Sequence, residues 1–400
     1  MGPQSSGKST IAKIISYCTW VEKDVATSQS LKAYLDNKNY FVDRLESFYK
    51  LNGYFKNPDR SIFYQSDVVE IAYSADDFSI KWRNRYAYQR SKISYIPSER
   101  NMIILPEVKK VTFDSTNIRS FMFDWFDEKK SYPKEKALPI LDLGLAYYYD
   151  KDADEDHILH TRNGASYDIL LSSASSGLQA ITPLVVTVDF LTGWFYKQDE
   201  SLSFEVLEEK IRKTNQILRE ELLVKKYFGN DAEADSEKIS AISEKISAGD
   251  AHALELLKAY DKVRKMLFST HNTQLIIEEP EQNLFPEAQR NLAYYLLDKI
   301  SSEAREHTLT ITTHSPYILY ALNNCMLGGL VGKKMKAPDR EKLKCKNSFI
   351  NPRAASIYEL HDGVLKSIQQ DDGLISANYF DAKMKELMDD FYVMLNYYEE

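Results

Sequence analysis

The sequence predicts an α/β fold in which a mixed sheet is flanked by helices. The chain opens on a glycine- and serine-rich loop, residues 2–9, and apolar residues at helical spacing follow it directly at 11–15. Much later, an apolar strand at 273–277, a helix at about 286–303 and a strand at 308–313 alternate. This order of strand, helix and strand is what a parallel sheet needs.

The opening loop matches the pattern G-x-x-x-x-G-K-[ST] at every fixed position. In such a loop, backbone N–H groups surround the β- and γ-phosphates of a nucleotide, a lysine shares their charge and a hydroxyl binds Mg²⁺. The following helix would point its N-terminus at the anion. The alternative is a Gly/Ser-rich tail without a ligand. The residues that the loop would bring to the nucleotide are Gly2, Gln4, Ser5, Ser6, Gly7, Lys8, Ser9 and Thr10.

The loop begins earlier than the fold predicts, because only Met1 precedes it. A phosphate-binding loop normally connects a buried strand to a helix. We therefore expect the first core strand to be missing, either because the start is assigned too far downstream or because the fold is altered.

Composition limits the classes of protein that fit. Four hundred residues with 44% hydrophobic content can form one large or two modest cores. No apolar run approaches the roughly 20 residues that span a bilayer, and no signal segment begins the chain, so we expect a cytoplasmic protein without a membrane partner. Three widely spaced cysteines argue against a disulfide framework. The net charge of −8 argues against a uniformly basic nucleic-acid binder, although lysines and arginines cluster at 333–346.

Hydropathy and charge divide the chain into four parts. They are a first core part with an antiparallel insert and a long apolar helix (1–196), an exposed helical arm (197–268), a second core part (269–325) and a C-terminal extension (326–400). Strand-like runs at 61–64, 78–82 and 92–97 predict the insert and a core strand, and the pattern from about 114 to 150 is helical. Dense Glu/Lys alternation marks the arm.

Paired carboxylates end the strand at 273–277, in the segment Glu278-Glu279-Pro280-Glu281. In a phosphoryl-transfer enzyme, the first acid can orient Mg²⁺ through its water shell and the second can polarise the attacking water. Two adjacent acids are costly unless a cation or solvent relieves them. The alternative is a strand that runs into an acidic surface turn.

Two further segments suit a phosphate site. Thr312-Thr313-His314-Ser315-Pro316 ends the next strand, at the sheet edge where ligands bind in open α/β folds, so His314 could reach a γ-phosphate. The alternative is a histidine that caps a strand–helix turn. The serine-rich segment 172–179 opens a long helix, and its small residues would let backbone amides approach a phosphate. Ordinary helix capping is the alternative there.

Together these motifs resemble those of the ATP-binding-cassette (ABC) ATPases, and most closely the soluble branch near RecF, the SMC proteins and the ATPase half of OLD-family nucleases. Residues 174–179 are similar to the signature L-S-x-G-x-Q, with alanine in place of the leading leucine. Residues 278–287 are similar to the E-E-P-E-x-x-L-x-P-E form of Walker B and D-loop. Residues 313–316 match the switch histidine, and residues 95–100 resemble the Y-I-P-x-E-R element of this branch.

The resemblance implies a P-loop NTPase fold, ATP and Mg²⁺ as ligands, and ATP hydrolysis. The implied roles are phosphate binding by Lys8, metal binding by Ser9 and Glu278, general-base catalysis by Glu279, and γ-phosphate sensing by His314. Ser175 and Gly177 would contact ATP bound to a second copy, so that a head-to-tail homodimer encloses two nucleotides. No glutamine occupies the Q-loop position, where Glu99 could replace it.

The extension at 326–400 is short for the Toprim nuclease domain of OLD proteins, and it has no D-x-D at the end of an apolar strand. We therefore expect an ATP-driven switch or scaffold for a separate effector, such as a nuclease or toxin, in antiviral defence. The alternative is a RecF- or SMC-like repair ATPase that clamps DNA directly, which salt-dependent DNA binding with ATP would reveal. The acidic motif and the arm argue against the ATPase subunit of a transporter.

Overall fold

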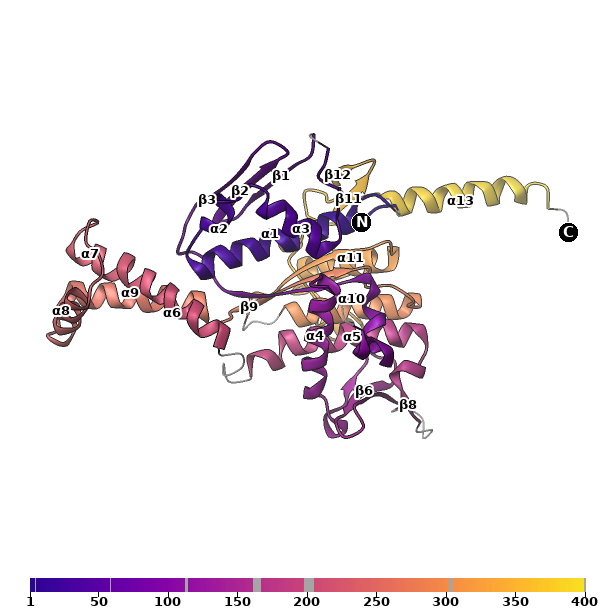
Figure 1. Ribbon diagram of the computed structural model, residues 1–400. Coiled ribbons are helices and arrows are strands. Elements are labelled where there is room, and N and C mark those ends of the chain that lie inside the picture. Colours follow the sequence, from indigo (N-terminus) through magenta and orange to yellow (C-terminus); the bar gives the residue numbers. More distant parts are fainter. Residues whose placement is uncertain are drawn as a thin grey trace. The chain divides into compact units, whose positions relative to one another are not determined.

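The structure, a computed structural model, describes residues 1–3, 5–57, 59–111, 114–160, 167–197, 205–301 and 305–398. Its described elements are helices and several sheets, so the predicted α/β class is confirmed (Figure 1). The chain forms two compact units. Unit 1 comprises residues 1–13, 94–194 and 275–400, and unit 2 comprises residues 14–93 and 195–274.

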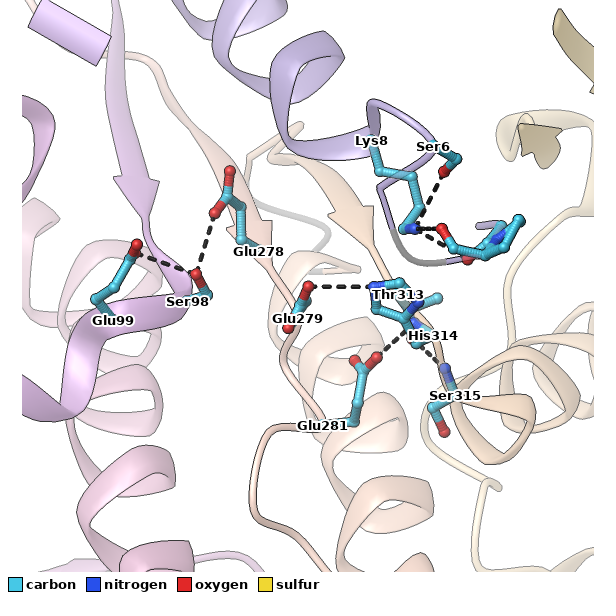
Figure 2. Close-up of polar contacts among 12 residues, drawn as sticks. Ser6, Lys8, Ser98, Glu99, Glu278, Glu279, Glu281, Thr313, His314 and Ser315 are labelled. Atoms are coloured by element: carbon cyan, nitrogen blue, oxygen red, sulfur yellow. Dashed lines mark hydrogen bonds and ion pairs between the residues drawn. The ribbon is translucent and has the colours of Figure 1, made fainter. Parts of the chain in front are cut away.

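The central sheet has the order β10-β9-β4 and its strands run parallel (Figure 2). The strands are β4 (Ser91–Ile96), β9 (Asn272–Glu278) and β10 (Thr308–Thr312). The middle strand β9 is buried along its apolar residues 275–277, as expected of a strand covered on both faces. Because the strands are parallel, their carboxyl ends lie at the same edge of the sheet. The segments that begin at Pro97, Glu279 and Thr313 leave the sheet there.

Four long helices begin in unit 1: α1 (Lys8–Ser28), α5 (Ser176–Thr192), α10 (Pro286–Ile300) and α11 (Pro316–Val331). Proline begins both α10 and α11, where its missing N–H costs nothing. The Ser315 hydroxyl accepts a hydrogen bond from the Ile318 N–H at 3.1 Å and so caps α11. In unit 1, α5 packs against α10 and against α4 (Asn117–Glu128).

Helix α5 corrects the expectation that no apolar run approaches membrane-spanning length. Among the described residues one stretch, Ser176–Tyr196, is long and apolar enough to cross a bilayer by length and composition alone. Within it, 61% of the most apolar window is buried inside the protein. A helix that is apolar on all sides and packed in a core passes the same test.

The helical pattern expected from about 114 to 150 is correct only for α4. The later residues form an antiparallel sheet, in which β5 (Leu138–Pro139), β6 (Leu145–Asp150), β7 (Glu155–His160) and β8 (Asp168–Leu170) follow in order. Aromatic residues favour strands because they pack on neighbouring strands of a pleated surface. Tyr148 of β6, for example, lies opposite His157 of β7, and their rings stack with centroids 4.8 Å apart.

Unit 2 contains the predicted antiparallel insert. Its strands are β1 (Ser61–Gln65), β2 (Val69–Ser74) and β3 (Phe78–Trp82), with the short helices α2 (Lys32–Leu35) and α3 (Tyr40–Tyr49) before them. The runs at 61–64 and 78–82 predicted β1 and β3, whereas β2 was missed. Residues of β2 alternate between buried and partly buried, so the strand has one face on the core.

The remainder of unit 2 includes the helices of the arm segment. They are α6 (Glu205–Arg219), a π-helical turn (Glu220–Val224), α7 (Lys225–Phe228), α8 (Ser236–Ser247) and α9 (Ala251–Phe268). Aspartate side chains cap the starts of α8 and α9. Asp235 accepts from the Lys238 N–H at 2.7 Å, and Asp250 accepts from the Ala253 N–H at 2.8 Å.

The C-terminal part of unit 1 forms the short helix α12 (Ala337–Glu341), the hairpin β11 (Tyr358–His361) and β12 (Val364–Ser367), and helix α13 (Tyr379–Leu395). The first residue of the chain pairs with this hairpin. The Met1 amine donates to the Tyr358 carbonyl at 2.8 Å, and the Leu360 N–H donates to the Met1 carbonyl at 2.7 Å. The opening loop is thereby held beside β11.

Candidate functional site

The opening loop turns tightly before α1. Its backbone is in the left-handed region at Ser5 (φ 58°) and Gly7 (φ 100°). Lys8, the first residue of α1, extends its ammonium back over the loop, where Nζ donates to the Gly2 carbonyl (2.9 Å), the Pro3 carbonyl (2.6 Å) and Ser6 Oγ (3.2 Å) (Figure 2). The predicted loop residues Ser9 and Thr10 lie in the first turn of α1. Gln4 lies outside the described residues.

Lys8 is 8% exposed, and its pKa depends on two carboxylates that are distant from it in the sequence. Burial lowers the pKa of Lys8, and the negative charges of Glu279 and Glu281 partly oppose that change. The loop at the start of the chain and the acidic turn after β9 are therefore electrostatic neighbours. The fold has brought together two motifs that are far apart in the sequence.

Glu279 and His314 meet at the carboxyl ends of β9 and β10. His314 Nε2 lies 3.2 Å from Glu279 Oε1, and the His314 N–H donates to Glu281 Oε1 at 2.5 Å (Figure 2). The Glu279 N–H donates to the Thr312 carbonyl at 2.9 Å, which joins the two strand ends through the backbone. Both side chains are about one third exposed, so a ligand can reach them.

Glu279 has a left-handed backbone, with φ at 42°. A residue with a Cβ pays for that conformation, and such strain persists only where the surrounding structure holds it. Because of this turn, the side chains of Glu278 and Glu279 point in different directions. Glu279 faces His314, whereas Glu278 points away from both (Figure 2).

Glu278 is buried, with 3% exposure, and its carboxylate is held by two hydroxyl groups. Tyr95 OH donates to Glu278 Oε1, and Ser98 Oγ makes a longer contact of 3.4 Å with Oε2. Among the described residues, no group of three or more His, Cys, Asp or Glu gathers as a metal site. Mg²⁺ that binds with a nucleotide takes most of its ligands from phosphate and water, so one hydroxyl and one carboxylate fit it chemically.

Arg100 is the important residue whose role the sequence did not reveal. It is fully buried in the 3₁₀ segment Ser98–Ile104. Its guanidinium donates to five backbone carbonyls: Ala180 (2.9 Å), Pro97 (3.2 Å), Glu278 (2.9 Å), Glu279 (2.9 Å) and Pro280 (3.3 Å). Burial lowers the pKa of Arg100 to about 10, and the charge of Glu281 is the largest effect in the opposite direction. Arg100 thus fixes the acidic turn and ties it to α5.

The available signal for Arg100 was its place in the Y-I-P-x-E-R element. From this element we predicted a role only for Glu99, which could replace the glutamine of the Q-loop. Glu99 is exposed, and its carboxylate accepts a hydrogen bond from Ser98 Oγ at 3.1 Å.

Ser175 and Gly177 lie at the start of α5. Ser175 is exposed and occupies the N-cap position, yet its side chain makes no capping hydrogen bond. The alternative that this serine caps the helix is therefore not supported by a side-chain hydrogen bond. Gly177 lies against the backbone of Asn283, where a Cβ would come within 2.8 Å of the Asn283 carbonyl oxygen. Within the described part of the chain, the Lys8 ammonium forms its hydrogen bonds with the opening loop and not with Ser175 or Gly177.

No protein-family profile matches this chain, and no curated protein matches it either. The functional argument therefore rests on the motifs and on the geometry of unit 1.

Proposed function

We propose that this protein binds and hydrolyses ATP as a P-loop ATPase of the ABC type, in the soluble branch near RecF, SMC and OLD proteins. One observation carries the proposal. Lys8 from the opening loop, Glu279 after β9 and His314 after β10 come together at one edge of the parallel sheet (Figure 2). A phosphate-binding loop, a carboxylate base and a polar sensor are the parts that phosphoryl transfer to water requires.

In this proposal Lys8 exchanges its present partners for phosphate. Its ammonium now donates to loop carbonyls, which a β- or γ-phosphate oxygen would replace with a stronger, charge-assisted bond. Glu279 would accept a proton from the attacking water, and its contact with His314 orients the carboxylate. Ser9 and Glu278 would hold Mg²⁺, which neutralises phosphate charge when it is bound. Tyr95 and Ser98 fix the Glu278 carboxylate for that purpose.

The exposed start of α5 suits a second copy. Ser175 and Gly177 would contact ATP held by the other protomer, so that ATP joins the copies and hydrolysis releases them. Such a dimer would switch or scaffold an effector, such as a nuclease or toxin, in antiviral defence. It would be a cytoplasmic protein.

Direct DNA clamping, as in repair ATPases, is the second candidate. It is favoured by the basic residues at 333–346, most of which are exposed. Two of these lysines already pair with acids, since Lys342 lies 3.1 Å from Asp339 and Lys346 lies 2.5 Å from Glu341. DNA binding that requires ATP and weakens steeply with salt would favour this candidate over the effector switch.

The test compares ATP binding and hydrolysis in three variants. Glu279→Gln keeps the shape of the site but lacks a base, so we expect ATP to bind and turnover to fall roughly 100-fold or more. Lys8→Ala removes the phosphate contact, so nucleotide binding is lost. Glu237→Gln, an exposed change on α8, serves as the matched control and should behave as wild type. Normal turnover in Glu279→Gln would show that the catalytic assignment is wrong.

A further inference from the structure

Helix α13 contacts the rest of its unit through its first turn, and its residues 381–395 are all exposed (Figure 1). Its start is fixed by a capping box, in which the Phe380 N–H donates to Asn378 Oδ1 at 3.0 Å and the Asn378 N–H donates to Asp381 Oδ2 at 3.1 Å. None of its 17 residues is buried. Since an isolated helix of this length is marginal in water, α13 needs a packing partner to be stable.

The apolar residues of α13 are spaced for helix–helix packing. Phe380, Met384, Leu387, Phe391 and Met394 follow one another at alternating intervals of four and three residues, the spacing of a coiled-coil seam. Leu387 is 65% exposed and Met394 is 64% exposed. An exposed apolar stripe of this length marks an interaction surface.

We propose that α13 pairs antiparallel with α13 of a second copy of this chain. With Met384 and Leu387 as seam positions, Lys383 and Asp390 take equivalent places beside the seam, one heptad apart. In an antiparallel pair these places face each other, so each lysine meets the aspartate of the other copy. In a parallel pair they would face the apolar Met388 and Leu395 instead. The charges therefore favour the antiparallel direction.

The C-terminal end of α13 needs cover on more than one side, because residues 391–395 are all apolar. An antiparallel partner brings this end beside the start of the other α13. That start is attached to α11, since Tyr320 OH donates to Asp381 and the Ile375 N–H donates to Asn323 Oδ1 at 2.9 Å. Tyr320, which makes the first of these contacts, is itself an exposed side chain of α11.

A lipid surface fits α13 less well than a second copy. Helices that lie on anionic membranes carry many lysines and arginines on the polar face. Here four acids, Asp381, Glu386, Asp389 and Asp390, outnumber the two lysines, Lys383 and Lys385. The self-complementary stripe and charges thus indicate a twofold contact. This contact needs no nucleotide and does not rest on the proposed ATPase activity.

The first experiment measures the mass of the full chain in solution, without nucleotide, by sedimentation equilibrium. We expect a dimer of the 46.2 kDa chain. Leu387→Glu places a charge in the seam of both helices and should weaken the dimer roughly 100-fold. Ala382→Glu adds the same charge on the opposite side of α13 and should leave the dimer intact. A monomeric wild type, or equal weakening by both variants, would overturn the proposal. A monomeric wild type that binds phosphatidylserine vesicles would indicate a lipid partner instead.

The second experiment tests direction by disulfide formation under copper phenanthroline. The three native cysteines are buried, so background cross-linking should be low. Phe380→Cys protein mixed with Phe391→Cys protein should form a cross-linked dimer, and neither variant should do so alone. Cross-linking of each variant with itself, and none between them, would show a parallel pair and overturn the antiparallel arrangement.

Discussion

Glu278 and Glu279 are adjacent in the chain, yet their carboxylates have different surroundings. Glu278 is buried beneath the Tyr95 and Ser98 hydroxyls, whereas Glu279 is one third exposed and faces His314. Alternation along an extended strand separates neighbouring side chains, and the left-handed backbone at Glu279 completes the change of direction. Under the proposed function, the two glutamates would therefore divide the roles of metal ligand and base.

The conformation of this turn depends on Arg100. Replacing it with lysine keeps a charge but supplies three donors for five carbonyls, so at least two of these charge-assisted hydrogen bonds are lost. Each costs about 1–3 kcal/mol, so we expect Arg100→Lys to lower the free energy of unfolding by roughly 2–5 kcal/mol. Thermal and denaturant unfolding measure this loss.

Arg100 also acts as a positioning residue for the proposed reaction, which it influences through the backbone of Glu279. We expect Arg100→Lys to lower kcat while KM for ATP changes little, because Lys8 and the loop are untouched. Arg290→Lys, at an exposed pair with Glu287, provides the control. A variant with reduced stability but an unchanged kcat would limit Arg100 to a structural role.

At the scale of elements, the opening loop depends on β11. Gly2 has φ at 151°, and a Cβ there would lie 2.1 Å from the Leu360 carbonyl oxygen. Only glycine fits, because the obstacle is backbone that is itself paired with Met1. Strand β11 comes from the far end of the chain, so the opening loop is supported by a segment that no local pattern connects to it.

We therefore expect Gly2→Ala to displace the loop from β11 and to weaken ATP binding at least about 10-fold. Gly249→Ala is the matched control, since Gly249 also has a positive φ of 79° but no atom lies within 4 Å of the added Cβ. That change should cost only about 1 kcal/mol of backbone strain. Calorimetric titration with a non-hydrolysable ATP analogue compares them, and equal affinities would contradict this role of β11.

At the scale of the whole molecule, the proposed reaction needs two copies. The ammonium of Lys8 binds the opening loop, whereas Gly177 lies against Asn283, beyond the acidic turn. If each ATP site combines Lys8 of one copy with Ser175 of the other, defects in different copies can complement each other. Lys8→Ala and Ser175→Arg are each expected to be inactive alone.

Co-expression of these two variants should restore activity. A mixed dimer has one site with both residues intact and one site with neither, so random pairing gives about a quarter of wild-type turnover. ATP hydrolysis by the co-purified mixture measures this value. Absence of any recovery, in a mixture shown to contain mixed dimers, would mean that each chain forms its site alone.

Features within short windows could be predicted from the sequence. The opening loop, the strands β9 and β10 and the helices α5 and α10 follow from apolar periodicity, glycine, proline and charged residues close to them in the chain. Strands β2, β5 and β6 were not predicted from the sequence. Short aromatic or mixed runs are compatible with a helix as well as with a strand, and only pairing with a neighbouring strand decides between them.

The sequence by itself determined which residues were candidates for the site, because each motif carries its residue types in a short, ordered pattern. Only the tertiary structure decided which of them meet. The Glu279–His314 contact, the Arg100 clamp on five carbonyls, the support of Gly2 by β11 and the exposure of α13 all join or separate residues that are distant in the chain. Such contacts depend on packing between elements, and local periodicity carries no information about that packing.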